Sequence, residues 1–224
     1  MSDFKLILVD TNREVTDAFN HFFSNYSINY PMIEAVYRSR FEEINGWDAI
    51  VSPANSFGIM DGGIDKAIIE FFGETLMQKV QEFIISYFSG EQPVGTAMVV
   101  PTFNDKHPYL IHSPTMSVPK SIVNTTNVYY AMWAVLNAVK THNRLSEMSG
   151  APIKKIERLL VAGLGTLTGR MSGMEAAFQM KEAIDNFVNQ PKNIDEINWD
   201  FAHTKHRQVN GLKKKKKICN RQTI

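Results

Sequence analysis

Short apolar segments alternate with segments of helical periodicity over the first 190 residues, and this alternation restricts the possible folds more than any other feature. The apolar segments are rich in Leu, Ile and Val and are bounded by turn residues, as buried strands are. They span residues 4–9, 32–37, 48–51, 96–100, 109–112 and 158–162. Apolar residues recur at helical spacing in 11–26, 64–72, 76–88, 129–142 and 174–188. The pattern predicts an α/β fold whose sheet is covered by helices on both faces.

Charge is distributed unevenly along the 224 residues, although the formal net charge is only +1. Residues 1–200 contain 16 Lys and Arg and all 23 Asp and Glu, whereas residues 201–224 contain eight Lys and Arg and no acid. We therefore predict one domain over residues 1–190 and a basic, disordered tail over residues 191–224. The run Lys213–Lys217 is either a solvated segment or one that directs nuclear import or binds a polyanion.

Several classes of protein are excluded by the composition. The one cysteine, Cys219, cannot form an internal disulfide, which favours a reducing compartment inside the cell. The amino terminus lacks the features of a signal peptide, and no run of about 18 apolar residues could cross a membrane. We expect a cytoplasmic protein with no membrane partner, with import into the nucleus as the alternative that the tail allows. An acidic body argues against nonspecific binding of duplex nucleic acid, so such contact is expected only through Lys213–Lys217.

Two glycine-containing loops follow predicted strands and lead into predicted helices. The first spans residues 52–65 and the second spans residues 163–172. In α/β sheets, ligands bind beyond the carboxyl ends of the strands, where loops present backbone N–H groups beside helix amino termini. Both loops are therefore candidate binding elements.

The second loop differs from the common nucleotide-binding motifs. Arg170 and Met171 follow Gly169 where a Walker loop needs Lys and then Ser or Thr, and Thr168 stands where a dinucleotide fingerprint needs its third glycine. Its backbone amides, with the hydroxyls of Thr166, Thr168 and Ser172, can wrap a diphosphate. The alternative is a plain connection between strand and helix.

Asn55 and Asp65 are the side chains of the first loop that could carry chemistry. The amide of Asn55 can donate to and accept from a sugar hydroxyl, but asparagine is also an ordinary turn residue. Asp65 opens a predicted helix, where a carboxylate caps free N–H groups without any further function. The histidine pairs His107/His112 and His203/His206 lack accompanying acids or cysteines, so we predict no metal site.

Five segments, taken in order, resemble motifs of the macro domain, a module that binds ADP-ribose. They are Asp48–Asn55 (DAIVSPAN, similar to DAIVNAAN), Gly62–Ile68 (GGIDKAI, similar to GGVDxAI), Gly95–Ala97 (GTA, similar to GxA), Tyr109–His112 (YLIH, similar to YVIH) and Ala162–Ser172 (AGLGTLTGRMS, similar to GLGTGxGGMS). The resemblance extends over about residues 30–190. Because any one motif would be weak evidence, the order of all five carries the resemblance.

The resemblance implies a three-layer α/β/α sandwich with a mixed central sheet of six or seven strands, and ADP-ribose across its carboxyl edge. The implied catalytic residues are Asn55, which would hold the distal ribose, and Asp65, which would act near the anomeric carbon. Gly165, Thr166 and Gly169 would wrap the diphosphate. The other implied ligand contacts are Ala54, Gly62, Gly63, Ile64, Gly163, Leu164, Leu167, Thr168 and Arg170. No cofactor and no metal are implied.

Three departures from the family pattern bear on function. Ser52 replaces the first asparagine of the strand-and-loop motif, and Leu167 and Arg170 occupy positions where glycine is usual. The Gly-Asp pair whose aspartate contacts adenine is replaced by Tyr37–Phe41 (YRSRF). The resemblance therefore leaves two functions open: a hydrolase of mono-ADP-ribose conjugates or ADP-ribose 1″-phosphate, and a reader that binds ADP-ribose without cleaving it.

Overall fold

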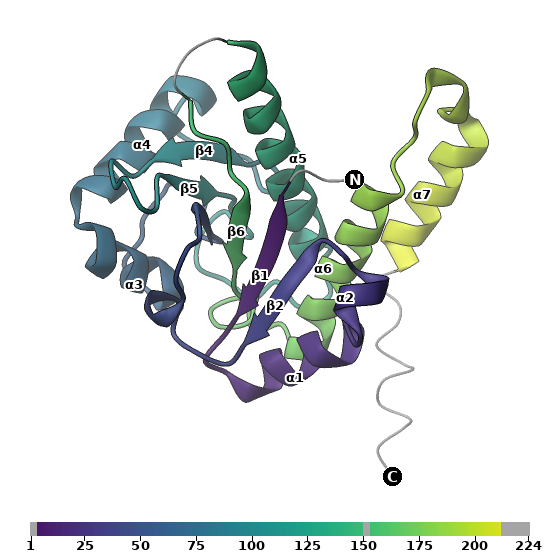
Figure 1. The fold of residues 1–224 in the computed structure, drawn as a ribbon, viewed down its shortest axis with the longest axis horizontal. Coiled ribbons are helices and arrows are strands. Elements are labelled where there is room, and N and C mark those ends of the chain that lie inside the picture. The colour runs from purple at the N-terminus through teal and green to yellow at the C-terminus, as the bar shows by residue number, and fades with distance from the viewer. Residues whose placement is uncertain (1–3, 150–152, 212–224) are drawn as a thin grey trace.

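The computed structural model describes residues 4–149 and 153–211, and Figure 1 shows a sheet between two groups of helices. The strands are β1 (Lys5–Val9), β2 (Ile33–Tyr37), β3 (Ala49–Ser52), β4 (Met98–Pro101), β5 (Tyr109–His112) and β6 (Arg158–Val161). The α-helices are α1 (Arg13–Phe22), α2 (Tyr26–Asn29), α3 (Gly63–Phe72), α4 (Thr75–Phe88), α5 (Asn127–Met148), α6 (Gly173–Val188) and α7 (Trp199–Gly211). Short 3-10 helices span Phe41–Glu43 and Ile194–Glu196.

The six strands lie in the order β2-β1-β6-β3-β5-β4. All neighbours are parallel except β4 and β5, which pair antiparallel, so the sheet is mixed. This confirms the predicted α/β fold with a mixed six-stranded sheet between helices. Each predicted strand and helix of the first 190 residues is present, with ends shifted by a few residues.

Alternating side chains of the central strands point to the two faces of the sheet, because successive residues of a strand face opposite sides. On β6, Leu159 and Val161 pack in a core with helices α1, α5 and α6, whereas Leu160 packs in a core with α3 and α4. These three side chains are completely buried. The strands in the middle of the sheet are therefore apolar on both faces, as the continuous runs predicted.

The segment after residue 190 differs in part from the prediction. We predicted disorder over residues 191–224, but residues 199–211 form helix α7. Val209 of this helix is buried, and the ammonium of Lys205 lies 4.5 Å from the centre of the Trp133 ring on α5. These tertiary contacts stabilise a helix that has little apolar periodicity of its own. Lys213–Lys217 and Cys219 lie outside the described residues.

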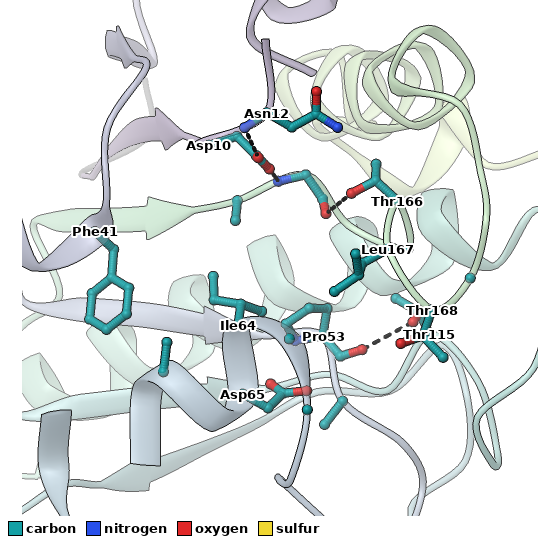
Figure 2. Close-up of a pocket in the computed structure, with 18 of the residues that line it drawn as sticks. Asp10, Asn12, Phe41, Pro53, Ile64, Asp65, Thr115, Thr166, Leu167 and Thr168 are labelled. Atoms are coloured by element: carbon teal, nitrogen blue, oxygen red, sulfur yellow. Dashed lines mark hydrogen bonds between the residues drawn. The ribbon is translucent and has the colours of Figure 1, made fainter. Parts of the chain in front are cut away.

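The carboxyl edge of the sheet is the open one. There, the loops after β1, β3 and β6 surround a cavity (Figure 2). Because β1, β6, β3 and β5 are parallel, the segments that follow them all emerge at this edge. Among the described residues, no helix is long and apolar enough to cross a membrane.

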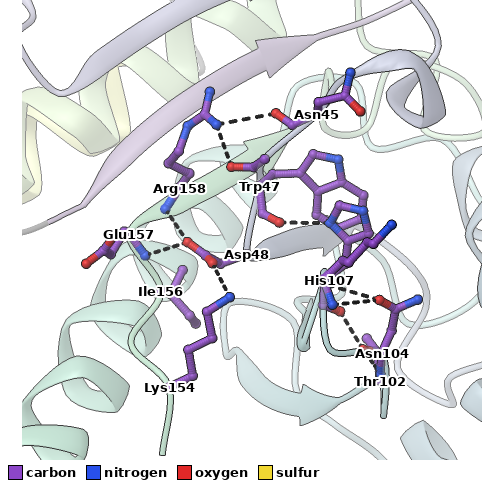
Figure 3. Close-up of polar contacts among 12 residues, drawn as sticks. Asn45, Trp47, Asp48, Thr102, Asn104, His107, Lys154, Ile156, Glu157 and Arg158 are labelled. Carbon is purple, nitrogen blue, oxygen red and sulfur yellow. Dashed lines mark hydrogen bonds and ion pairs between the residues drawn. The ribbon is translucent and has the colours of Figure 1, made fainter.

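The amino edge of the sheet is closed by a polar network (Figure 3). The carboxylate of Asp48 accepts hydrogen bonds from the backbone N–H groups of Glu157 and Arg158, both at 3.0 Å, and pairs with Lys154 at 2.9 Å. The Arg158 side chain donates to the carbonyl of Gly46 and pairs with Glu34 of β2. This network connects the starts of β2, β3 and β6. The amino edge is therefore occupied by contacts between strands, whereas the carboxyl edge contains the cavity.

Candidate ligand-binding cleft

A cavity of about 510 Å³ lies at the carboxyl edge, and we call it the cleft. Its wall comes from three segments far apart in the sequence: residues 9–12 after β1, residues 53–65 after β3, and residues 162–169 after β6. Residues 39–42 after β2 and residues 115–119 after β5 complete it. Its volume lies in the range of small-molecule sites, for which about 300 to 1,000 Å³ is typical.

The loop after β6 is shaped by two glycines that tolerate no side chain. Gly165 has a φ of +70°, and a Cβ there would lie 2.6 Å from the side chain of Ile122. A Cβ on Gly169 would lie 2.4 Å from the carbonyl oxygen of Gly165, which accepts a hydrogen bond from Met171 N–H at 3.1 Å. The loop therefore folds back on itself as it enters α6.

The backbone donors of this loop are available to a ligand. Within the described part of the chain, the N–H groups of residues 165–169 make no hydrogen bond, and all five residues line the cleft. The side chains that line the cleft include the carboxyl groups of Asp10, Glu42, Asp61 and Asp65 and the guanidinium of Arg40. Arg40 is engaged by Glu42 at 2.6 Å. Attraction for an anion must therefore come from the free N–H groups rather than from cationic side chains.

Asp10 connects two walls of the cleft. One oxygen of its carboxylate accepts from Asn12 N–H at 2.8 Å, and the other accepts from Gly163 N–H at 3.1 Å. Burial raises the pKa of the Asp10 carboxyl, against the opposing effect of these backbone donors. The turn after β1 is thereby fixed to the start of the β6 loop.

Asn55 organises the loop after β3. Its side-chain NH₂ donates to the carbonyl of Ile59 at 2.7 Å, and its side-chain oxygen accepts from the N–H groups of Phe57 and Ile59 at 3.0 and 3.3 Å. This is the turn role that asparagine commonly has. Asn55 also lines the cleft, and an amide NH₂ has a second hydrogen that can reach a ligand.

Asp65 lies in the cleft wall in the first turn of α3, held by the last residue of β3. Its Oδ1 accepts a hydrogen bond from the hydroxyl of Ser52 at 2.7 Å. Burial raises the pKa of the Asp65 carboxyl to about 7, the hydrogen bond from Ser52 lowers it, and the charge of Asp61 raises it further. Near neutral pH the group is therefore divided between its acid and base forms, as a proton-transfer residue requires.

The side chains of His112 and Gln92 form a buried polar pair beside the end of β3. Nδ1 of His112 lies 2.6 Å from Oε1 of Gln92, and the Gln92 side chain donates to the carbonyl of His112 at 3.2 Å. Because the Gln92 oxygen can only accept, Nδ1 carries the proton and Nε2 does not. Burial lowers the pKa of His112 to about 3, so the ring stays neutral in the folded protein.

The His112 environment makes the protein sensitive to acid. Between pH 6.5 and about 3 the unfolded chain binds a proton at His112 that the folded protein does not, so stability is lost as the pH falls. We expect up to about 1.4 kcal/mol of unfolding free energy lost per pH unit in this window. Urea unfolding from pH 7 to pH 4 should show the stability of His112→Asn rising relative to that of the wild type as the pH falls, because the variant lacks this loss.

The exposed His203 provides the control for that experiment. His203→Asn should leave the pH dependence of unfolding as it is in the wild type. An equal pH dependence in His112→Asn and the wild type would contradict the prediction.

Most of the residues expected at the site do line the cleft. They are Ala54, Asn55, Gly62, Gly63, Ile64, Asp65, Gly163, Gly165, Thr166, Leu167, Thr168 and Gly169. Leu164 is not among the residues that line the cleft, and its side chain is fully buried in the core. Arg170 is also not in the cleft wall, because a φ of +55° turns the chain and leaves the residue exposed outside.

Sequence reasoning missed Asp10, Asn12, Arg40 and Phe41, which also line the cleft. The only signal for Asp10 and Asn12 was their position directly after the first predicted strand. Their place in the wall depends on the strand order, which sets β1 beside β6.

Comparison with known proteins agrees with this fold. The family model of the macro domain matches residues 51–148. A protein of Aquifex aeolicus is 30% identical over 150 residues, which make up 67% of this chain and 79% of that protein. The chain belongs to the macro domain family.

A second relative of this macro domain, from Aeropyrum pernix, is 28% identical over 130 residues, which make up 58% of this chain and 59% of that protein. Both relatives are described as uncharacterized proteins, so they carry no activity over.

Solved macrodomains resemble the fold. The macrodomain of Mycobacterium tuberculosis DarG aligns with a TM-score of 0.52 and 16% identity over 67% of this chain and 90% of that one. The Oceanobacillus iheyensis macrodomain with ADP aligns with a TM-score of 0.40 and 17% identity over 64% of this chain and 85% of that one. At 16% identity the likeness to the DarG macrodomain concerns the fold alone.

Proposed function

We propose that this macro domain binds ADP-ribose in the cleft and hydrolyses its mono-conjugates. The observation that carries the proposal is the loop of residues 165–169, which lines the cleft beside the start of α6 and whose five N–H groups make no hydrogen bond to the described residues. Such an arrangement is suited to a diphosphate, because backbone donors and a helix amino terminus stabilise anions without a cationic side chain.

The two ends of the cleft differ in a way that fits the two ends of ADP-ribose. Asn55 and Asp65 both belong to the segment after β3 and line the cleft, where a polar amide and a carboxyl group suit the distal ribose. Asp10, directly after β1, and Phe41, in the segment after β2, line the cleft as well, and a carboxyl oxygen and an aromatic ring suit adenine. Asp10 thereby takes the place of the aspartate that the family pattern puts after the next strand.

Hydrolysis would use Asp65 as the proton-transfer group. A water oxygen forms a bond to C1″ of the distal ribose while the bond from C1″ to the carrier breaks. The water proton passes to the Asp65 carboxylate, and Asp65 then gives a proton to the leaving group, so the carboxylate is regenerated. The near-neutral pKa of Asp65 supports this role, because the group can both accept and return a proton.

A reader that binds without cleavage is the second candidate function. It is favoured by Leu167, which is 71% exposed. The Leu167 side chain reaches Gly63 of the other loop, so that a Cβ on Gly63 would lie 3.0 Å from it. An apolar side chain over the ribose end could retain the ligand and limit access of a carrier.

A calorimetric titration paired with a turnover assay on the same sample tests the proposal. We expect ADP-ribose to bind with a Kd of about 1 to 10 μM, corresponding to about −7 to −8 kcal/mol, and AMP and ribose 5-phosphate to bind at least about tenfold more weakly. A mono-ADP-ribosylated peptide and ADP-ribose 1″-phosphate serve as the two substrates. No binding of ADP-ribose would overturn the proposal. Binding of ADP-ribose without its release from either substrate would favour the second candidate, a reader that does not cleave.

A further inference from the structure

Ser52 is the departure from the family motif with the clearest structural consequence. The motif has an asparagine at this position, whereas this chain has a serine whose hydroxyl donates to Oδ1 of Asp65 at 2.7 Å. We propose that Ser52 is a positioning residue that fixes the Asp65 carboxyl, so that Oδ2 is the oxygen presented to the ligand. This inference rests on the proposed function, because it assigns the support of the same acid.

The hydroxyl of Ser52 is held rigidly. Ser52 ends β3, has no exposed surface, and pairs with His112 of β5 in the parallel ladder. Its carbonyl accepts from Ser113 N–H at 3.0 Å. A donor fixed by a central strand can hold the Asp65 side chain, in the first turn of α3, in one rotamer at little further entropic cost.

The two oxygens of Asp65 have different surroundings. Oδ1 accepts the hydrogen bond from Ser52. Oδ2 has no hydrogen-bond partner among the described residues, but it is not one of the fully buried polar atoms that lack a partner, so it keeps some accessible surface. Asp65 lies in the cleft wall, as Figure 2 shows. The geometry therefore leaves one defined oxygen for proton transfer, and an acid that is held in place reacts faster than one that rotates.

Among the described residues, the Ser52 hydroxyl is the one hydrogen-bond donor to the Asp65 carboxyl, and the nearby charged groups act on it differently. Asp61, in the loop before α3, acts on it by repulsion. Lys66, the next residue, is directed toward Glu70, whose carboxylate lies 3.9 Å from its ammonium. His112, beside Ser52 in the sheet, stays neutral. Removing the Ser52 hydroxyl should therefore raise the pKa of Asp65, because the donor stabilises the carboxylate form.

The test compares Ser52→Ala with Ser52→Thr, which keeps the hydroxyl. We expect Ser52→Ala to move the Asp65 titration, followed by carboxyl ¹³C NMR of the ligand-free protein, upward by about one pH unit. In the turnover assay, kcat should fall about 10- to 100-fold, and the acid limb of the pH–rate profile should shift upward by about one pH unit, as the titration does. The Kd for ADP-ribose should stay within about twofold of the wild-type value. Ser52→Thr should restore both the titration and kcat.

Ser56 provides the matched control in the same segment. Its hydroxyl is buried and has no hydrogen-bond partner among the described residues, so Ser56→Ala should leave the Asp65 titration and kcat unchanged. An unshifted Asp65 titration in Ser52→Ala, or equal loss in Ser52→Thr, would overturn the inference. The NMR titration needs no ligand, so it decides the role of Ser52 even if the wild-type protein fails to bind ADP-ribose.

Discussion

Replacing Gly169 with alanine is expected to weaken ADP-ribose binding by more than about 100-fold, equivalent to a loss of about 2.7 kcal/mol. The added Cβ would lie 2.4 Å from the carbonyl oxygen of Gly165 and 2.8 Å from the side chain of Ile122. The first of these is a backbone atom, so a change of rotamer cannot relieve the contact. The loop must open, and the alignment of the N–H groups over residues 165–169 is then lost. Calorimetry with ADP-ribose measures the effect.

Gly211 offers a glycine-to-alanine control outside the cleft. A Cβ there has no atom within 4 Å, so Gly211→Ala should bind ADP-ribose as the wild type does. Circular dichroism of both variants separates a local change of the loop from global unfolding. Binding by a folded Gly169→Ala protein within about threefold of wild type would show that this loop does not hold the diphosphate.

Asp65→Asn is expected to reduce turnover by about 100- to 10,000-fold and at the same time to stabilise the protein above pH 7. The folded-state pKa of about 7 is higher than the ordinary value of 3.8. The stability that this carboxyl contributes is therefore fully present below pH 3.8 and is lost as the pH rises through 7. Asparagine keeps the shape and the acceptor for Ser52 but never ionises, so it avoids that loss.

The size of the stabilisation follows from the same shift. Three pH units correspond to an upper limit of about 4 kcal/mol, and partial exposure of the residue reduces this to about 2 kcal/mol. Urea unfolding should show wild type and Asp65→Asn with similar stability at pH 4 and a growing difference toward pH 8. Asp105→Asn, which removes an exposed carboxylate, should show no such divergence. Equal stability of Asp65→Asn and wild type at pH 8 would contradict the prediction.

The sequence was sufficient to predict the secondary structure and most of the cleft because those features depend on local patterns. The apolar runs that became β1, β3 and β6 are buried on both faces, and the loops that follow them contain the glycines and polar residues of the wall. Features that depend on distant contacts were not predictable. Leu164 sits within a glycine-rich loop, yet its side chain enters the core, and the backbone turn at Arg170 leaves that side chain outside the cleft.

Helix α7 and the hydrogen bond between Gly163 and Asp10 also depend on distant contacts that local sequence patterns do not predict. The helix is stabilised by burial of Val209 and by the position of Lys205 over Trp133, and neither contact has a signal in its own segment. Asp10 meets Gly163 although 153 positions separate them in the chain, because the strand order brings their two strands together. The division of the chain at residue 190 remains a prediction.

The strand order also has a consequence for biosynthesis. Strand β6, which lies between β1 and β3 at the middle of the sheet, is the last of the six to be made. Until it inserts, β1 and β3 each expose the edge that pairs with β6 in the finished sheet. Such long-range pairing forms slowly and leaves the nascent chain open to aggregation. The cleft, whose wall needs the residues that follow both β1 and β6, therefore forms only after residue 169 has left the ribosome.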